Sequence, residues 1–213
     1  MTHRVLMIPP WLRLWHWSNA ACFLALIYSG SSLHFAGTAL DGVLLDFANA
    51  RKVHNVAGLT LAALYLFFLV QGVRSGNLRQ YFPRLDASWW QELWAVMGYY
   101  GGGIFKGAPH PFVPTPERKF NPLQQVTYLG VTLGGLPLLI ASGVLFFFPE
   151  VFPDQILGMG GIWPLAVGHY LIAFFLTLFL VGHVYIITCG ATLTSELKMM
   201  ITGWHEHKDS GNE

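Results

Sequence analysis

The sequence predicts an all-α integral membrane protein: a four-helix bundle with both termini in the cytoplasm and a surface helix between its second and third spans. First, 54% of the 213 residues are hydrophobic and only 11% are charged, against about a quarter charged residues in soluble domains. Second, the charged residues are bunched, and long apolar stretches separate them. Third, the basic residues fall in alternate connections. Residues 1–213 are interpreted as one membrane domain.

Four windows contain no Asp, Glu, Lys or Arg, and each holds an apolar stretch of about 20 residues, the length that a helix needs to cross a bilayer. These windows are residues 14–40, 53–73, 120–149 and 155–195. We expect helices near residues 14–35, 53–73, 123–148 and 164–188. Backbone groups inside lipid must be satisfied internally, which favours helices over irregular chain.

Basic residues set the expected orientation. Ten of the twelve lie at the N-terminus, in the 74–121 connection and in the C-terminal tail, and the other two are Arg51 and Lys52. By the positive-inside rule, we expect both termini of this multi-pass membrane protein to lie in the cytoplasm. A cleaved signal peptide is the alternative for the first segment, but its length and its tryptophans at 11, 15 and 17 favour a retained helix.

The hydrophilic 74–121 connection contains one amphipathic stretch. Trp90, Leu93, Trp94 and Met97 recur at helical spacing after Ser88, which is a plausible N-cap. The pattern predicts a helix over residues 88–100 that lies on the cytoplasmic membrane surface. An irregular loop should follow through the glycines at 101–103 and the proline-rich stretch 109–116.

Four histidines inside the expected helices carry the functional hypothesis: His16, His54, His169 and His183. His169 and His183 are 14 residues apart, which places them about 21 Å apart along the helix and within about 40° of one face. Depth in the membrane pairs His54 with His169 on the outer side and His16 with His183 on the cytoplasmic side. Two bis-imidazole sites in a helix bundle are what two b-type haems require. A site closed on both axial faces carries electrons and does not bind oxygen.

The glycines near these histidines and the remaining histidines each allow more than one role. Gly58, Gly168 and Gly182 lie beside the paired histidines, where the missing side chain would let a flat macrocycle approach; helix packing is the alternative, and it is the expected role of Gly130 and Gly134. His34 is expected at the outer rim, with outer iron ligation as its alternative. Four further histidines (His3, His110, His205 and His207) fall in tails or loops and are expected to be solvated.

Several segments resemble the prokaryotic cytochrome b561 superfamily over residues 11–204. The segments are Arg13-Leu14-Trp15-His16-Trp17 with Asn19, His54 near the start of the second helix, Asn121-Pro122-Leu123-Gln124-Gln125, and His183-Val184-Tyr185 with Gly190. That group includes the membrane subunits of formate dehydrogenases, nickel–iron hydrogenases and thiosulfate reductases, and the last branch is the most similar here.

The resemblance implies two haems b with the same histidine pairing, and a quinone site beside the cytoplasmic haem. Asn121 and Gln124 match the quinone-lining element of the formate dehydrogenase branch, whereas Leu123 and Gln125 replace its glycine and lysine. Asn121 is also a good helix N-cap, with Pro122 following it. Three cations are expected to neutralise haem propionates or acidic lipid: Arg13, Arg118 and Lys119. Arg13 and Gly58 are therefore counted with the haem-binding residues, and Lys119 with the quinone site.

These expectations make the chain the membrane electron-transfer subunit of an oxidoreductase, without substrate catalysis of its own. It would connect the quinone pool to an outer-face partner carrying iron–sulfur, molybdenum, nickel–iron or multihaem centres. A histidine-based metal transporter and a non-catalytic membrane anchor are the alternatives. The nearly equal numbers of basic and acidic residues, 12 and 11, provide no basic field for nucleic acid. Cys22 and Cys189 form no CxxC motif.

Overall fold

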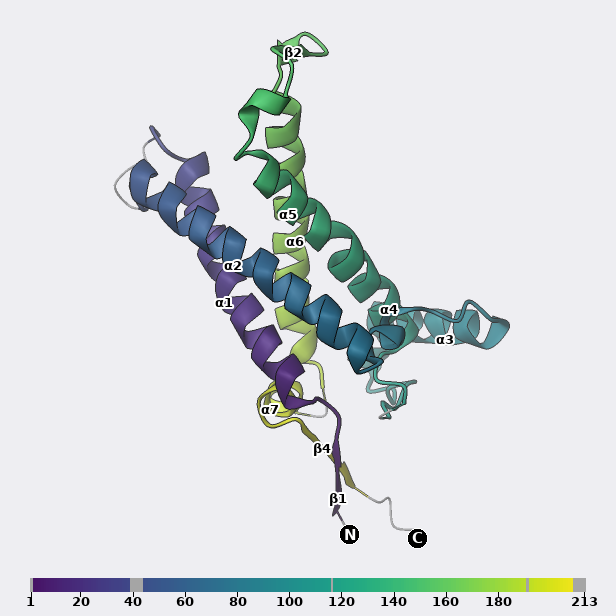
Figure 1. The fold of residues 1–213 in the computed structure, drawn as a ribbon. Helices are drawn as coiled ribbons and strands as arrows, with labels where there is room; N and C mark the ends of the chain where they lie inside the picture. Colours follow the sequence, from purple (N-terminus) through teal and green to yellow (C-terminus); the bar gives the residue numbers. More distant parts are fainter. Residues whose placement is uncertain (1, 39–43, 116, 191, 209–213) are drawn as a thin grey trace.

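The computed structural model describes residues 2–38, 44–115, 117–190 and 192–208, and these are mostly helical (Figure 1). The helices are α1 (Pro10–His34), α2 (Phe47–Arg74), α3 (Ala87–Gly98), α4 (Pro122–Leu129), α5 (Leu136–Leu145), α6 (Trp163–Ile187) and α7 (Ser195–Thr202). Short helical turns are η1 (Asn77–Tyr81), η2 (Tyr99–Gly103), η3 (Ile104–Lys106), η4 (Gly130–Gly135) and η5 (Pro149–Val151), and the strands are β1 (Thr2–Leu6), β2 (Gln155–Ile156), β3 (Met159–Gly160) and β4 (Trp204–Lys208).

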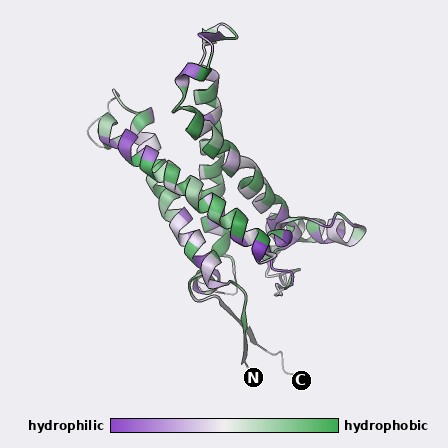
Figure 2. Cartoon of the chain, in the orientation of Figure 1, coloured by the Kyte–Doolittle hydropathy of each residue, from purple (hydrophilic) through white to green (hydrophobic). Residues whose placement is uncertain are grey.

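Two antiparallel helical pairs build the bundle (Figure 1). The first is α1 with α2, and the second is the continuous α4–η4–α5 segment with α6. Three segments are long and apolar enough to cross a membrane: Phe47–Arg74, Pro122–Leu145 and Trp163–Ile187. Hydrophobic residues, green in Figure 2, occur along most of each of these three segments. The chain is therefore a multi-pass membrane protein in its architecture.

Helix α1 has the length of a span, 25 residues, but it is not among the three apolar segments. Its first half carries Arg13, His16 and Asn19, and these polar side chains lower its mean hydropathy. The helix packs along α2, where Leu61 and Phe68 are almost fully buried. Trp15, expected at the membrane surface, instead stacks on Phe68 with ring centroids 4.3 Å apart. That α1 is a fourth span stays a prediction.

Two helices begin earlier than the hydrophobic pattern predicts. Helix α1 starts at Pro10, because a proline at the first helical position loses no hydrogen bond. Helix α2 starts at Phe47, since the Asp46 carboxylate accepts a hydrogen bond from the backbone N–H of Asn49 at 3.0 Å and caps the helix. His54 consequently lies two turns inside α2 and not at its first residue.

The third expected helix, residues 123–148, is interrupted by the π-helical turn η4. Pro137 follows this turn and cannot donate a backbone hydrogen bond, so the wider turn accommodates it. The expected packing role of Gly130 and Gly134 is wrong, because a Cβ at either would meet no atom within 4 Å. Gly135 makes the close contact instead: its Cβ would lie 3.1 Å from Leu176 Cδ2 on α6.

The predicted surface helix forms as α3, but Asp86 caps it and not Ser88. Asp86 Oδ1 accepts from the backbone N–H of Trp89 at 2.8 Å and from the Ser88 hydroxyl at 2.6 Å. Leu93 is buried against the protein, together with Trp89 and Val96. Trp90, Trp94 and Met97 from the predicted stripe are exposed.

The two termini meet at one end of the bundle, which we call the near end (Figure 1). Strand β1 pairs antiparallel with β4, from Thr2 opposite Lys208 to Leu6 opposite Trp204. The sequence pattern places these residues only in tails, because strand pairing over five residues has a weak local signal. The opposite end, called the far end, carries the small β2–β3 hairpin. The expected loop residue Pro116 lies outside the described residues.

Candidate functional site: two histidine pairs

The four intramembrane histidines meet in two pairs, and helix α6 contributes one member to each. His16 of α1 and His183 of α6 have ring centroids 6.2 Å apart. His54 of α2 and His169 of α6 have ring centroids 6.3 Å apart. The backbone of α6 packs mainly on α5, and α6 meets α1 and α2 at these sites through its two imidazoles. The structure brings together the two pairs that the sequence predicts.

The pairs lie at different depths in the bundle. His16 follows the start of α1 and His183 precedes the end of α6, so this near pair lies toward the termini. His54 and His169 lie in the first turns of α2 and α6, and this far pair lies toward the β2–β3 hairpin. The topology of the helices therefore separates the pairs along the bundle axis.

Serine hydroxyls hold both rings of the far pair. Ser29 Oγ on α1 is 3.0 Å from His54 Nδ1, and Ser142 Oγ on α5 is 2.9 Å from His169 Nδ1. A glycine follows each serine, and a Cβ there would lie 3.4 Å from the histidine Cε1. The small residues let each ring lie directly against the neighbouring helix, which fixes its orientation.

Aromatic rings and unpaired polar atoms surround the near pair. Phe179 stacks on His183 at 5.8 Å, and Tyr128 packs on the same ring at 6.5 Å. Among the described residues, five side chains hold a buried nitrogen or oxygen atom without a hydrogen-bond partner. Four of these atoms lie on one stretch of α1: Arg13 Nε, Trp15 Nε1, His16 Nδ1 and Asn19 Oδ1. Buried polar atoms are normally satisfied, so this cluster indicates that a polar group of a ligand belongs beside His16.

The glycines near the histidines leave room. A Cβ at Gly168 or Gly182 would meet nothing within 4 Å, and one at Gly58 would meet only Leu26 Cδ2 at 3.9 Å. These positions are consistent with the expected close approach of a flat group to α6 and α2.

His34 stands apart from both pairs. It stacks on Tyr170 of α6 with centroids 5.0 Å apart and planes 15° apart, which is the expected rim position at the far end. His110 in the long connection is exposed, as expected of a solvated histidine, and it contacts Tyr99 and Tyr100. The side chains of the three histidines in β1 and β4 lie outside the described part of the structure.

The cations expected to meet haem propionates or lipid have protein partners. Arg13 Nη1 donates to the carbonyl of Ile201 at 2.8 Å, near the end of α7. Arg118 forms an ion pair with Glu92 and lies over the Phe112 ring at 5.1 Å. The hydrogen bonds that Arg118 donates to the Glu92 carboxylate raise the pKa of Arg118. Only Arg13, with its unpartnered Nε, lies within two turns of a paired histidine.

The residues expected at a quinone site lie at the near end. Asn121 Oδ1 accepts from the backbone N–H of Gln124 at 2.9 Å, and Gln124 Oε1 accepts from that of Asn121 at 3.0 Å. This capping box uses one oxygen of each amide, and Asn121 is 2% exposed. Lys119 Nζ donates to Asn77 Oδ1 at 3.3 Å and lines a cavity of about 360 Å³ with Trp11. Burial lowers the pKa of Lys119.

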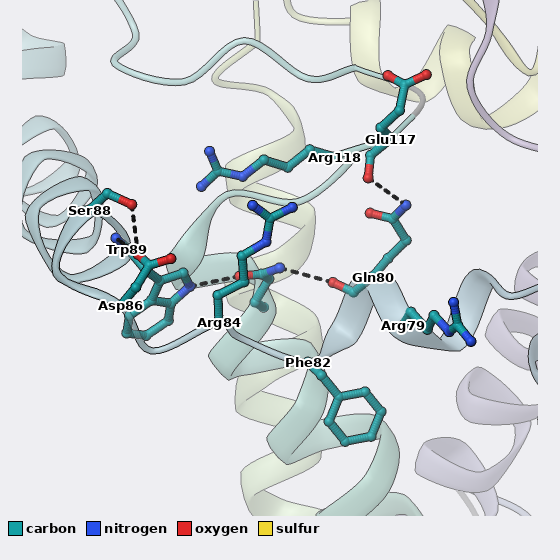
Figure 3. Close-up of a pocket in the computed structure, with 10 residues that line it drawn as sticks. Arg79, Gln80, Phe82, Arg84, Asp86, Ser88, Trp89, Glu117 and Arg118 are labelled. Atoms are coloured by element: carbon teal, nitrogen blue, oxygen red, sulfur yellow. Dashed lines mark hydrogen bonds between the residues drawn. The ribbon is translucent and has the colours of Figure 1, made fainter.

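A second near-end cavity of about 270 Å³ lies between η1, α3 and α4 (Figure 3). Trp89 Nε1 donates to Gln125 Oε1 at 2.8 Å, and Gln125 Nε2 donates to the carbonyl of Gln80 at 3.1 Å. Gln125, which replaces the lysine of the formate dehydrogenase element, therefore ties three elements together and also lines this cavity.

Comparison with known proteins decides the family. The model of the family described as prokaryotic cytochrome b561 matches residues 8–203. The chain belongs to the prokaryotic cytochrome b561 family. It is 39% identical to "Putative cytochrome YdhU" of Escherichia coli (strain K12) over 92% of this chain and 72% of that protein. It is 25% identical to "Probable Ni/Fe-hydrogenase B-type cytochrome subunit" of Azotobacter vinelandii over 93% of this chain and 87% of that protein.

Membership of the cytochrome b561 family makes this protein a b-type cytochrome, a membrane electron-transfer protein that carries haem b. The described residues fit such a group. They contain no cluster of three or more His, Cys, Asp or Glu that would hold a bare metal ion, but they do contain two opposed imidazole pairs. A porphyrin supplies its own equatorial nitrogens, so two axial imidazoles suffice.

Sequence reasoning missed the second layer of the site: Ser29, Ser142, Tyr128 and Phe179. One signal was present for the serines, since each begins a Ser-Gly dipeptide that precedes a far-pair histidine by 25 or 27 residues. Tyr128 and Phe179 resemble ordinary apolar residues of a span, and only the packing on His183 distinguishes them.

Proposed function

We propose that this cytochrome b561-family protein binds two haems b, one between the histidines of each pair. The spacing of the rings carries the proposal. An imidazole nitrogen binds a first-row metal such as zinc at about 2.0–2.1 Å, and the ring centre lies about 1.1 Å behind it, so two imidazoles across one metal have centres about 6.3 Å apart. The ring centroids are 6.2 Å and 6.3 Å apart in the near and far pairs.

When bound, haem b supplies a one-electron carrier whose iron is closed on both axial faces. His16, His54, His169 and His183 would hold the iron atoms. The glycines at 58, 168 and 182 would admit the macrocycle, and Arg13 Nε would meet a propionate of the near group. Helix α6, with both of its histidines on one face, would keep the two groups in a fixed relation.

The protein would act as the membrane subunit of a larger oxidoreductase in a bacterial inner membrane, with the near end in the cytoplasm. Two relatives are named as cytochrome subunits of Ni/Fe-hydrogenase. That naming supports a catalytic partner subunit at the far, outer end. The partner would carry iron–sulfur, molybdenum, nickel–iron or multihaem centres. The quinone pool would exchange electrons at the near end.

The near-end quinone site would centre on Lys119, which combines a protonated donor, partial burial and a cavity. Lys119 Nζ would donate to a quinone carbonyl and hold a proton beside it. Asn121 and Gln124 would fix the start of α4, whose Tyr128 reaches the ring of His183. This links the amides to the near pair through one helix.

Haem quantification on the purified protein tests the proposal. The reduced-minus-oxidised spectrum should give two b haems per chain. His16→Ala or His183→Ala should remove one haem and quinone reactivity, while His34→Ala, the matched control stacked on Tyr170, should keep both. Colourless protein with bound zinc would support a transporter, and a full haem content in every histidine variant would refute the ligand set.

Quinone turnover tests the second part. Lys119→Met and Asn121→Ala should each slow quinone turnover while both haems remain. Lys106→Met, an exposed lysine in the same connection, should leave turnover at the wild-type rate. Equal rates in all three variants would remove Lys119 and Asn121 from the quinone site.

A further inference from the structure

The far pair is bound by hydroxyl groups in a way that the near pair is not. Ser29 and Ser142 lie on different helices, α1 and α5, yet each Oγ contacts the Nδ1 atom of one histidine on the next helix. In the near pair, His16 Nδ1 is buried without a partner. The difference lies in which atom of the imidazole is held, and it therefore bears on the electronic state of the ring.

The direction of these hydrogen bonds follows from the backbone. Ser29 Oγ donates to the carbonyl of Ala25 at 2.7 Å, and Ser142 Oγ donates to the carbonyl of Leu138 at 2.8 Å. A hydroxyl has a single hydrogen, and a carbonyl oxygen can only accept. The serine oxygen therefore offers a lone pair to Nδ1. The backbone carbonyls of Leu26 and Leu139 also accept from the rings of His54 and His169. Both contacts favour the tautomer in which Nδ1 carries the hydrogen and Nε2 carries the free lone pair.

We propose that Ser29 and Ser142 are positioning residues of the far haem site, which accept the Nδ1–H of His54 and His169 and lower the midpoint potential of the far iron. The inference rests on the proposed function, since it needs the far pair to ligate a haem. A hydrogen bond accepted from the second nitrogen fixes the ring and makes the first nitrogen a stronger donor. A stronger donor favours the ferric state over the ferrous state.

Burial makes this effect strong and specific. Ser29 is 0% exposed and Ser142 is 9% exposed, so water competes little for the Nδ1–H. Gly30 and Gly143, which follow the serines, let each imidazole edge lie against the helix backbone. A Cβ atom at either glycine would lie only 3.4 Å from the histidine Cε1. A Ser-Gly dipeptide on α1 contacts His54 of α2, and a second one on α5 contacts His169 of α6. Both proposed axial ligands of the far site are therefore held in the same way.

Spectroelectrochemical titration of the purified cytochrome tests the proposal with Ser29→Ala, Ser142→Ala and the double variant. The far haem is identified as the one lost in His54→Ala. Its midpoint potential should move to more positive values in each single variant and further in the double variant, with a matching change in its ferric EPR signal. The near haem should keep its potential in all three.

Ser32→Ala is the matched control. Ser32 is 2% exposed, and its hydroxyl donates to the carbonyl of Tyr28 at 2.8 Å, one turn from Ser29. Its loss should shift neither potential. An unchanged far potential in the double variant, or an equal shift in Ser32→Ala, would overturn the proposal.

Ser142→Thr separates a hydrogen bond from simple packing. If Ser142→Ala loses the far haem, a threonine that restores both haem and potential supports the hydroxyl role, and one that restores neither overturns it. Wild-type protein without two haems would instead refute the proposed function, and the inference with it. Wild-type protein with two haems and indifferent serines would refute the inference alone.

Discussion

The Trp89 indole donates to Gln125 Oε1 where η1, α3 and α4 meet, and the two side chains are 3% and 7% exposed. Leaving one buried partner unpaired costs about 1–3 kcal/mol, whereas removing both costs less than the sum. This single hydrogen bond should therefore contribute measurably to the free energy that holds α3 on the bundle.

Trp89→Phe and Gln125→Leu should each lower the stability of the purified protein by about 1–3 kcal/mol. The double variant should lose less than the two single losses added together, because neither the indole nor the Gln125 amide is then left unpaired. The bond from Gln125 to the Gln80 carbonyl is lost equally in Gln125→Leu and in the double variant. Thermal unfolding in detergent, followed by circular dichroism, measures the coupling. Strict additivity would show that the contact contributes nothing.

Asp86 makes the start of α3 sensitive to pH. Hydrogen bonds from Ser88 and from the Trp89 backbone hold its pKa below the ordinary value of 3.8. Since the folded pKa is depressed, the carboxylate stabilises α3 above the ordinary pKa, and this contribution is lost as the pH falls through the folded pKa. Below about pH 4, the amides of residues 87–90 should therefore lose protection relative to the exchange rates of an unfolded chain at the same pH. Asp86→Asn, which caps without titrating, should abolish that loss of protection; an unchanged pH profile in the variant would contradict the assignment.

Some residues could be assigned from the sequence and others could not. The spacing of His169 and His183 on one helix, together with the depths of His16 and His54, was enough to predict both pairs. Ser29 and Ser142 were not predictable, because a serine inside a span usually bonds only its own helix. Arg118 was assigned to propionates or lipid, but its partner is Glu92, and no local pattern joins residues 26 positions apart.

Helix α3 divides its apolar residues between two faces. Leu93 packs on the protein with its neighbours Trp89 and Val96, while Trp90 and Trp94 are 46% and 66% exposed. Tryptophans favour the membrane–water interface, where an apolar ring and a polar N–H are both accommodated. The exposed face therefore supports the prediction that α3 lies on the membrane surface.

Spin labels on α3 check this prediction in liposomes. Met97→Cys lies on the exposed aromatic face and Ala95→Cys on an exposed face turned away from it, both in a background with Cys22→Ala and Cys189→Ala. The label at 97 should be accessible to oxygen and shielded from a water-soluble nickel chelate, and the label at 95 should show the reverse. Equal chelate access at both positions would place α3 in water.

At the element level, hydrophobic stretches predicted where helices occur but not how they begin or bend. Asp46 caps α2 and Pro10 begins α1, and both lie outside the apolar windows. A hydrophobic pattern cannot locate such residues, because a helix cap is polar and a proline at a helix start is not strongly apolar. Pro137 introduces the π turn η4 without reducing hydropathy. The β1–β4 pairing joins the two ends of the chain, and such a distant contact leaves no periodic pattern in either segment.

The bundle consists of two similar halves, α1 with α2 and the α4–η4–α5 segment with α6, and the histidine pairs lie between them. Each half pairs a helix carrying Ser-Gly with the helix that carries a far-pair histidine: Ser29 with His54, and Ser142 with His169. Because α6 also carries His183, the second half supplies a ligand at both depths, and α1 and α2 supply one each. The two proposed haems can lie at separate depths only if all four helices cross the membrane together.

The four predicted crossings would place the ends of the helices in a fixed order, which cysteine labelling in spheroplasts can measure. In the cysteine-free background, Asp154→Cys lies between α5 and α6 at the far end, and Lys106→Cys follows α3 at the near end; both positions are exposed. A membrane-impermeant maleimide should label 154 in spheroplasts and label 106 only after permeabilisation, because the positive-inside rule predicts that the basic near end faces the cytoplasm. A Cys introduced at Gly37, beyond the end of α1, should behave like position 154. Labelling of position 37 only after permeabilisation would leave α1 without a crossing, and it would separate His16 from the depth that pairs it with His183.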